Sequence, residues 1–172
     1  MGRLPADLSG GVLAPEAVRL AQAATDKVDA VRRSGQVLVE IGAVGPGYVD
    51  AMLEREEMVS TFVGEGVAIP HGTNSGKDLV HRTALGFLQF PAGVDWGDGA
   101  TVQVCIPIAA SGGEHMELLS ALAMVLLDPV LAERLRSATS ADDVLAVLEQ
   151  ASDDESDEAD ESAEESVEGV AR

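Results

Sequence analysis

The sequence predicts an α/β fold, a single domain in which a mixed β-sheet is flanked by helices. Three observations support this prediction. A chain of 172 residues, 46% of them hydrophobic, has the length and the apolar content for one domain with its own core. Apolar, β-branched stretches typical of strands occur among stretches with the apolar spacing of helices. The chain shows no internal repeat, so we expect one layered domain over residues 1–150.

Two helices are predicted in the first third of the chain. Thr25 offers an N-cap before acidic residues, and Gly42 is a plausible stop, so we expect a helix over residues 26–41. Pro46 is expected to open the second helix, at a first-turn position that proline tolerates. The buried stripe of that helix is predicted to contain Val49, Met52 and Leu53. The apolar residues 18–24 fit either a strand or a helical turn, and their period does not separate the two.

An extended segment, residues 61–69, is predicted to lead into a sharp turn. Two glycines break the segment, and it ends in the sequence Pro-His-Gly-Thr. Because Pro70 and Gly72 flank His71 and both punctuate the chain, we expect His71 on a turn, outside any regular element. We expect its side chain to be held rigidly and exposed at the end of the strand.

Two strands are predicted in the second half. Residues 83–90 (TALGFLQF) have strand character, and the glycine-rich residues 91–99 (PAGVDWGDG) are expected to form a loop. Residues 102–109 form a near-continuous apolar run, which is typical of a strand buried on both faces.

Helices are predicted to complete the domain. Ser111 and Glu114 form a capping box that should start a long helix through Leu127. Asp128–Pro129 should interrupt that helix. A short helix is expected at residues 130–135. A last helix, capped by Ser140 with Asp143, is expected to run to Leu148.

The charge of the chain is strongly acidic and unevenly distributed. The formal net charge is -19. Residues 151–172 hold ten carboxylates and one arginine, a charge of -9, which leaves -10 on the rest of the chain. An acidic body repels phosphate backbones and disfavours nucleic-acid binding, whereas basic protein partners are attracted. We expect residues 151–172 to form a disordered acidic tail that acts either as a solubilising segment or in partner choice.

Cysteine usage and hydropathy indicate a cytoplasmic protein. Cys105 is the single cysteine, so no intrachain disulfide can form, which fits a reducing compartment. The N-terminus lacks the apolar core of a signal peptide, and no run of about 18 apolar residues exists to span a membrane. Aromatic residues make up only 3% of the chain, which leaves little material for stacking on bases or sugar rings.

His71 is the first candidate for chemistry. A neutral imidazole is a good nucleophile near pH 7, because its pKa lies close to ambient pH. Phosphoryl transfer demands little covalent work from a protein beyond in-line positioning and stabilisation of charge on the equatorial oxygens. A histidine held at a turn suits that chemistry. The alternative interpretation is a loop histidine that has no functional role.

His115 and Arg55 are further candidates for binding an anion. The predicted capping box places His115 in the first turn of a helix, where backbone N–H groups and the positive end of the helix dipole favour anions. Arg55 offers a planar fork for phosphoryl oxygens. The alternatives are an exposed histidine at a helix start and a solvated arginine that pairs with the neighbouring glutamates.

The remaining candidates have structural interpretations. Cys105 lies in a buried strand and is expected to be an inert core residue. His81 is expected to face solvent. No cofactor is expected, and no short-range pairing of ligands supports a zinc site.

Several separated blocks of the sequence resemble one family. Residues 51–73 (AMLEREEMVSTFVGEGVAIPHGT) are similar to the active-site region of the enzyme IIA domains of the bacterial phosphoenolpyruvate-dependent sugar phosphotransferase system, mannitol/fructose class, and are closest to the mannitol-specific branch. The resemblance covers residues 12–149, and its other blocks are FLQFPAGVDWGDG, CIPIAASGGEHMELLSALAMVLLDPVLAERL and TSADDVLAVLE. The acidic tail is not part of the family pattern.

The resemblance implies a phosphocarrier. In that family a histidine of the PHGT turn accepts a phosphoryl group from the phosphocarrier protein HPr and passes it to a cysteine of the enzyme IIB component, for sugar uptake. By position His71 would be the acceptor, and Arg55 and His115 would be the active-site arginine and second histidine. We expect Arg55, His115 and the backbone N–H groups of Gly72 and Thr73 to hold the phosphoryl oxygens, without a metal ion.

Two other functions fit the same residues. One is a regulatory enzyme IIA-like domain, in which the phosphorylation state of His71 controls binding to another protein. The other is an enzyme that uses His71 and His115 as general acid and base on a small molecule. Mannitol is the favoured sugar, with fructose and other polyols behind it.

Overall fold

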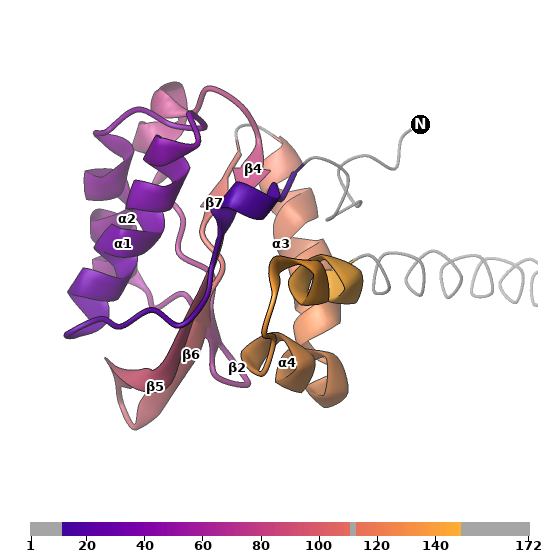
Figure 1. Cartoon of the computed structure of the whole chain (residues 1–172). Coiled ribbons are helices and arrows are strands. Elements are labelled where there is room, and N and C mark those ends of the chain that lie inside the picture. The colour runs from indigo at the N-terminus through magenta and orange to yellow at the C-terminus, as the bar shows by residue number, and fades with distance from the viewer. Residues whose placement is uncertain (1–11, 111–112, 149–172) are drawn as a thin grey trace, which may run out of the picture.

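The computed structural model describes residues 12–110 and 113–148 and shows a three-layer α/β domain (Figure 1). The strands are β1 (Val18–Arg19), β2 (Phe62–Gly64), β3 (Val67–Ala68), β4 (Ala84–Leu85), β5 (Phe87–Gly97), β6 (Ala100–Cys105) and β7 (Ile108–Ala109). The helices are α1 (Lys27–Glu40), α2 (Tyr48–Met58), α3 (Gly113–Leu126), α4 (Pro129–Arg136) and a last one over residues 141–148, with 3-10 turns η2 (Pro15–Ala17) and η3 (Asn74–Leu79). Helices α1 and α2 cover one side of the strands, and α3, α4 and the last helix cover the other.

The sheet is mixed, as predicted. Its order is β1-β5-β6-β3-β2, and β4 and β7 form a separate two-stranded sheet. β1 pairs with β5, and β3 with β6, in parallel, whereas β5–β6 and β2–β3 are antiparallel. The predicted α/β fold is therefore confirmed. Of residues 18–24, only Val18 and Arg19 form a strand, and residues 20–24 belong to neither a strand nor a helix.

The predicted loop over residues 91–99 is wrong, because β5 continues to Gly97. The side chains of Val94 and Trp96 are buried while Asp95 between them is exposed, the alternation of a strand with one face on the core. Gly97 pairs with Ala100, so Asp98–Gly99 is a two-residue hairpin turn. Both turn residues have positive φ, 54° and 82°, the conformation that Asp-Gly favours in tight hairpins.

Each of the two strands predicted over residues 83–90 and 102–109 is divided in two. The breaks fall at Gly86 and Pro107. There the two segments separate from the large sheet, and their outer parts pair with each other as β4 and β7. The Gly86 N–H donates to the Pro107 carbonyl at 3.0 Å, and a Cβ at residue 86 would lie 3.0 Å from Pro107 Cγ. Proline has no N–H to donate to a neighbouring strand, and glycine permits the close approach of the two backbones. This pair therefore forms a bend between the two sheets.

Helix boundaries follow side-chain caps. The cap of α1 is Asp26 rather than Thr25: Asp26 Oδ1 accepts the Asp29 N–H at 2.8 Å, and Asp29 Oδ2 accepts the Thr25 N–H at 3.0 Å. Helix α2 begins at Tyr48, so Pro46 lies just outside its first turn.

The C-terminal caps match their predictions. The break at Asp128–Pro129 is confirmed, since Asp128 Oδ1 accepts the Val130 N–H at 2.9 Å and caps α4. The Ser140 cap is confirmed as well, because Ser140 Oγ accepts the Asp143 N–H at 3.1 Å. The Ser111 cap and the acidic tail lie outside the described residues.

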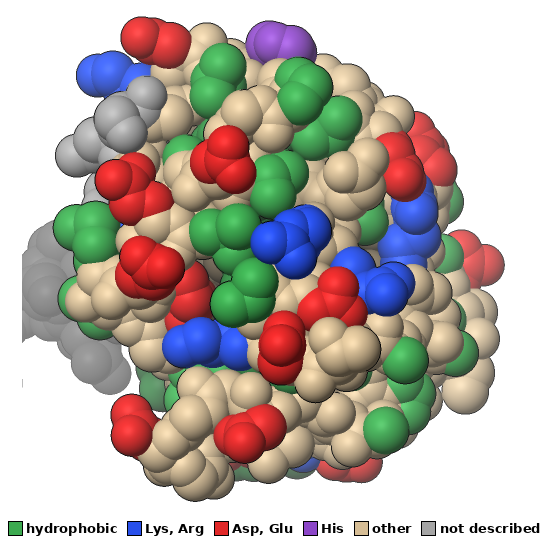
Figure 2. All heavy atoms as spheres, turned by 90° about the vertical axis from the view of Figure 1, so that its left-hand side faces the viewer, with side chains coloured by type: hydrophobic (Ala, Val, Ile, Leu, Met, Phe, Trp, Pro, Cys, Tyr) green, Lys and Arg blue, Asp and Glu red, His purple; other side chains and the backbone are tan. Residues whose placement is uncertain are grey.

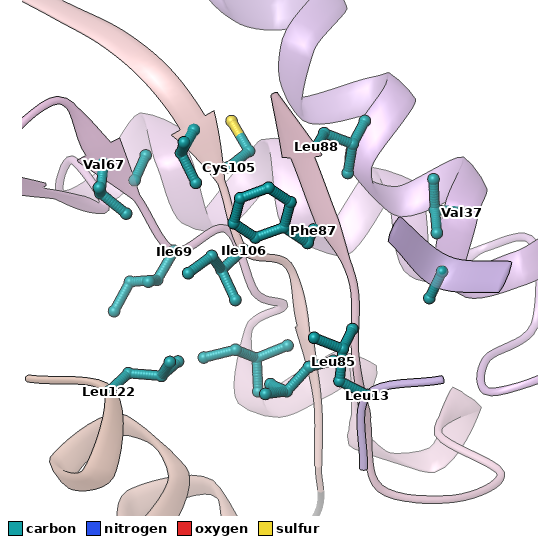
Figure 3. Packing of buried hydrophobic residues seen from close by; sticks show 14 of the residues in the cluster. Leu13, Val37, Val67, Ile69, Leu85, Phe87, Leu88, Cys105, Ile106 and Leu122 are labelled. Atoms are coloured by element: carbon teal, nitrogen blue, oxygen red, sulfur yellow. The ribbon is translucent and has the colours of Figure 1, made fainter. Parts of the chain in front are cut away.

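The core lies on both faces of the sheet and consists largely of aliphatic side chains. Figure 3 shows the Phe87 ring among Leu88, Cys105 and Ile106, with Val37 of α1 on one side and Leu122 of α3 on the other. Within the described residues, no helix is long and apolar enough to cross a membrane.

On the side that Figure 2 views, acidic, basic and apolar side chains are interspersed.

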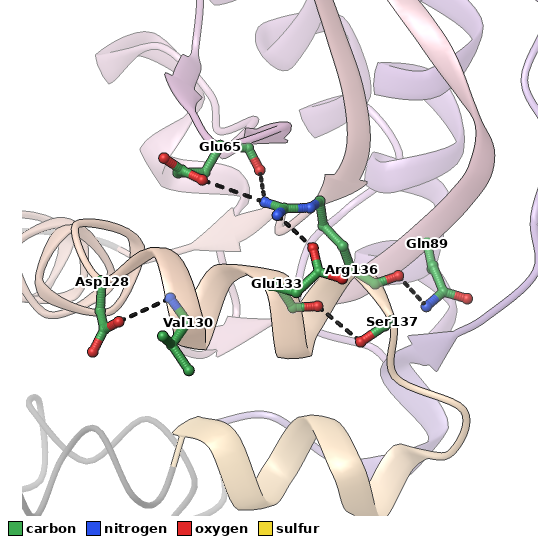
Figure 4. Close-up of polar contacts among 7 residues, drawn as sticks. All are labelled: Glu65, Gln89, Asp128, Val130, Glu133, Arg136 and Ser137. Atoms are coloured by element: carbon green, nitrogen blue, oxygen red, sulfur yellow. Dashed lines mark hydrogen bonds and ion pairs between the residues drawn. The ribbon is translucent and has the colours of Figure 1, made fainter.

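Two polar side chains fix α4 to the sheet (Figure 4). The buried Gln89 of β5 donates from Nε2 to the carbonyls of Arg136 and Ala138, at 3.1 and 2.8 Å. The Arg136 guanidinium donates to the Glu65 carbonyl in the β2–β3 turn and forms an ion pair of 2.6 Å with Glu133. These contacts hold α4 and the residues that follow it against β5 and against the β2–β3 turn, of which only the turn precedes His71.

Candidate functional site

His71 lies in the turn that follows β3, beside β7. It forms an isolated parallel bridge with Ile108, whose N–H donates to the Pro70 carbonyl at 2.9 Å. Its position outside a regular strand is as predicted. The expectation of an exposed side chain is wrong, because only 5% of the residue surface is accessible. The bridge to Ile108 places the backbone of β7 beside this turn.

The hydrogen bond of the imidazole defines which ring nitrogen can react. Nδ1 of His71 lies 2.8 Å from the Ile69 carbonyl oxygen. A carbonyl oxygen only accepts, so Nδ1 must carry the proton of this hydrogen bond. In the neutral ring the lone pair is therefore on Nε2. This arrangement makes Nε2 the nucleophilic atom.

Tyr48, at the start of α2, holds the His71 turn from the other side. Its hydroxyl donates to the Ile108 carbonyl at 3.0 Å and accepts the Gly72 N–H at 2.9 Å. Burial raises the pKa of this hydroxyl, so it remains a neutral donor. The Tyr48 hydroxyl thus connects Gly72, which follows His71, to Ile108, which forms the backbone bridge with His71.

The same contact explains why glycine follows His71. A Cβ at residue 72 would lie 2.7 Å from Tyr48 Cε1, so a larger residue does not fit without movement of the ring. The Gly72 N–H donates to Tyr48 in this structure, so it would have to exchange this partner to hold a phosphoryl oxygen, and that role stays a prediction. The role of Tyr48 was not predicted from the sequence, although it is the single tyrosine of the chain and a buried tyrosine requires a partner for its hydroxyl.

Arg55 lies on the helix that runs beside the His71 turn. Tyr48 at the start of α2 contacts Gly72, and Thr61, shortly after its end, accepts the Ile69 N–H at 3.0 Å. Helix α2 therefore lies along residues 69–72. The Arg55 guanidinium donates to the Val59 carbonyl at the end of its own helix, and no hydrogen bond that we describe joins it to the turn.

His115 and Thr73 complete the set of predicted site residues. Thr73 is partly buried and follows Gly72 directly before η3. His115 falls in the first turn of α3, as predicted, and its side chain lies outside the described part of the structure. Because α3 begins five residues after Ile108, and a chain spans at most about 3.5 Å per residue, the start of α3 lies within about 18 Å of the His71 bridge.

Glu56 differs from the other acidic residues at the end of α2. We expected a solvated group of charges here, but only 6% of Glu56 is accessible. Its carboxylate accepts hydrogen bonds from Thr61 and from Trp96. The sequence pattern held no signal for this burial, since Glu54 and Glu57 beside it are exposed.

The other candidates are where the sequence placed them. Cys105 is fully buried, and burial raises the pKa of its thiol to about 12, so it is an inert core residue as predicted. His81 is exposed, also as predicted. Among the side chains that the structure describes, which exclude that of His115, no group of three His, Cys, Asp or Glu residues is arranged to hold a metal ion.

Comparison with known proteins identifies the family. The family described as "Phosphoenolpyruvate-dependent sugar phosphotransferase system, EIIA 2" matches residues 12–151. The fold and the histidine turn thus define a phosphotransferase-system domain. The chain belongs to the EIIA 2 family of this system, whose members are phosphotransferases that carry the phosphoryl group on a histidine.

Individual relatives agree with this assignment. The mannitol-specific phosphotransferase enzyme IIA component of Bacillus subtilis (strain 168) is 38% identical over 141 residues, 82% of this chain and 99% of that protein. The multiphosphoryl transfer protein of Escherichia coli O157:H7 is 50% identical over 125 residues, 73% of this chain. The matched part is 33% of that protein, so the chain corresponds to about a third of its length.

Solved structures show the same fold. The crystal structure of IIA mannitol from Escherichia coli has a TM-score of 0.74 and 40% identity, over 78% of this chain and 97% of that one. The complex of enzyme IIAMTL with phosphorylated enzyme IIBMTL from Escherichia coli has a TM-score of 0.74 and 39% identity, over 78% of this chain and 95% of the matched chain.

Proposed function

We propose that this chain is a cytoplasmic phosphocarrier that accepts a phosphoryl group from phospho-HPr on His71 and passes it to a cysteine of an enzyme IIB component, for the uptake and phosphorylation of mannitol. The observation that carries the proposal is the hydrogen bond from His71 Nδ1 to the Ile69 carbonyl, at 2.8 Å. It directs the lone pair to Nε2 in a turn held rigidly by Tyr48. The relatives named mannitol-specific, and the solved complex of a related IIA protein with a IIB protein, support the choice of sugar and partner.

The transfer needs only the histidine and a positioned donor. Nε2 of His71 attacks the phosphorus of the donor phosphohistidine in line, the new N–P bond forms, and the donor imidazole leaves with the electron pair of the old bond. Phosphorylation at Nε2 makes the ring of His71 cationic while Nδ1 keeps its proton. The Ile69 carbonyl stabilises that charge through a charge-assisted hydrogen bond. In the second transfer a cysteine thiolate attacks the same phosphorus and the electron pair returns to Nε2.

Arg55, His115 and the Thr73 backbone N–H are proposed to bind the phosphoryl oxygens. A guanidinium can donate two parallel hydrogen bonds to such a group. The described hydrogen bond to the Val59 carbonyl uses one of the five N–H donors of Arg55, at Nη1, so the guanidinium has further donors for the phosphoryl oxygens. The helix start that carries His115 adds a favourable dipole. The Gly72 N–H can join this set by giving up its hydrogen bond to the Tyr48 hydroxyl.

The surface beside Arg55 favours a protein as the partner. Met58 and Val59 follow it in the chain and are 68% and 63% exposed. Exposed apolar side chains next to a reactive group fit the centre of a protein interface. The charge of -10 on the body, calculated from the sequence, would attract a basic partner surface.

The first experiment is intact-mass analysis after incubation with phosphoenolpyruvate, enzyme I and HPr. We expect one acid-labile phosphoryl adduct on the wild type and on His81→Ala, the matched control at an exposed histidine, and none on His71→Ala. Subsequent loss of the adduct on addition of a IIB protein and mannitol would separate transport from a regulatory role. A wild type that stays unmodified beside active partners would refute the proposed function.

A further inference from the structure

Glu56 is the one buried carboxylate among the described residues. Burial of an ionised group is costly unless hydrogen bonds compensate for the lost water. Glu56 has three such bonds: Oε1 accepts from Thr61 Oγ1 at 2.5 Å, and Oε2 accepts from the Thr61 N–H at 3.1 Å and from Trp96 Nε1 at 3.0 Å. Thr61 and Trp96 are themselves buried, with 4% and 3% of their surfaces accessible. The Glu56 carboxylate is therefore a buried, hydrogen-bonded part of the protein interior rather than a solvated surface charge.

The two partners of Glu56 lie in different directions from it. Trp96 belongs to β5, near the end of the long hairpin, and has no described contact with the His71 turn. Thr61 connects α2 to β2, and its carbonyl accepts the Ile69 N–H at 3.0 Å. The Ile69 carbonyl in turn accepts from His71 Nδ1 at 2.8 Å. A continuous path of hydrogen bonds thus joins the carboxylate to the imidazole through Thr61 and Ile69.

The contact between Glu56 and Thr61 also lies next to the hydrogen bond of Arg55. Val59, whose carbonyl accepts from Arg55, lies two residues before Thr61. By binding both the N–H and the hydroxyl of Thr61, Glu56 fixes the chain between the end of α2 and β2. Any shift of Thr61 would be transmitted to Ile69, and so to the orientation of the imidazole and its distance from the arginine.

We propose that Glu56 is a positioning residue for phosphotransfer, which acts through Thr61 and Ile69 to hold His71 with Nδ1 protonated and Nε2 directed to the phosphoryl donor. This inference rests on the proposed function, and it adds a residue that touches neither the histidine nor the phosphoryl group. Small displacements of reacting groups by remote changes lower rates by as much as about a hundredfold, so a positioning role has a measurable effect.

Two variants separate positioning from general stability. Thr61→Val removes one donor to Glu56 on the path to His71, and Trp96→Phe removes one donor to the same carboxylate on the other side. Thr61→Val is nearly isosteric and Trp96→Phe keeps a smaller aromatic ring, and each change removes one hydrogen bond to Glu56. Thr61→Ser, which retains the hydroxyl, is the rescue variant.

The measurements are made on the full chain. The first is the rate of adduct formation with phospho-HPr over a range of donor concentrations, and the second is the tautomer of the unphosphorylated His71 ring by nitrogen chemical shifts in NMR. We expect Thr61→Val to lower the saturated rate about tenfold with an unchanged half-saturating concentration, and to show a mixture of tautomers. Trp96→Phe and Thr61→Ser should stay within about twofold of the wild type with the wild-type tautomer.

Equal effects of Thr61→Val and Trp96→Phe on rate and tautomer, or no effect of either, would overturn the positioning role and leave the proposed function intact. A wild type that accepts no phosphoryl group would remove the proposed function instead, and the tautomer measurement would still decide whether the Glu56 path orients His71. If Thr61→Val does not fold, Thr61→Ala takes its place with the same expectations.

Discussion

The buried hydroxyl of Tyr48 shows how one side chain determines the geometry of the His71 turn. It satisfies two backbone groups that would otherwise be buried, the Gly72 N–H and the Ile108 carbonyl. A buried polar group without a partner costs about 1–3 kcal/mol, so the phenol stabilises the turn by more than its packing alone. The turn is consequently rigid before any phosphoryl group arrives.

Tyr48→Phe tests this contribution, because it keeps the ring and removes only the oxygen. We expect the free energy of unfolding to fall by about 1–3 kcal/mol, since the Gly72 N–H and the Ile108 carbonyl both lose their partner. Urea denaturation followed by circular dichroism measures the change. A loss of stability below about 0.5 kcal/mol would mean that water replaces the hydroxyl at both groups.

Gly72→Ala probes the same contact from the other side. The new Cβ would lie 2.7 Å from Tyr48 Cε1, so the ring or the turn must move, and overpacking of this kind costs about 1–3 kcal/mol. Gly45→Ala is the matched control, because a Cβ there meets its nearest neighbour at 3.7 Å, an ordinary contact. Thermal unfolding should show a lower midpoint for Gly72→Ala and little change for Gly45→Ala. Equal shifts for the two variants would contradict the proposed clash.

At the scale of single residues, the sequence predicts the backbone conformation of a candidate residue better than its surroundings. Pro70 and Gly72 on either side of His71 correctly indicate a turn outside a strand. The burial of His71 was not predictable, because its neighbours in space include Ile108, which lies more than thirty residues away in the chain. Glu56 was missed for the same reason, since its donor Trp96 comes from a distant hairpin.

At the scale of elements, local signals predict ends well and lengths poorly. The Asp128–Pro129 break and the Ser140 cap are correct because a cap is a contact between residues two to four apart. Residues 91–99 were predicted as a loop because they are rich in turn formers, yet only Asp98 and Gly99 make the turn. The alternation of Val94, Asp95 and Trp96 before an Asp-Gly pair was the available sign of a hairpin.

The start of α1 offers a test of a cap that the sequence placed one residue early. Asp26→Ala removes the oxygen that accepts the Asp29 N–H, so the free energy of unfolding should fall by about 0.5–2 kcal/mol. Asp26→Asn keeps a side-chain acceptor and should remain close to the wild type. Chemical denaturation of the three proteins side by side decides the matter, and an Asp26→Asn loss as large as that of Asp26→Ala would point to charge rather than to capping.

At the scale of the whole molecule, burial in an aliphatic core couples stability to alkaline pH. Cys105 lies at the centre of the sheet beside Phe87 and Ile106 (Figure 3), and burial raises the pKa of its thiol from 9.0 to about 12. The folded chain keeps this proton in a range where the unfolded chain releases it. Between these two pKa values the unfolded state binds fewer protons, so the free energy of unfolding decreases as the pH rises.

The slope of this decrease is the last prediction. One proton contributes at most about 1.4 kcal/mol per pH unit, and the raised pKa of Tyr48 adds a second contribution in the same direction above its ordinary value of 10.0. Cys105→Ala removes the thiol contribution and keeps that of Tyr48. Urea denaturation at pH 8 and at pH 10 should therefore show a smaller loss of stability in Cys105→Ala than in the wild type. Identical losses in the two proteins would mean that the thiol does not stay protonated in the folded core, and that other groups set the alkaline limit of the fold.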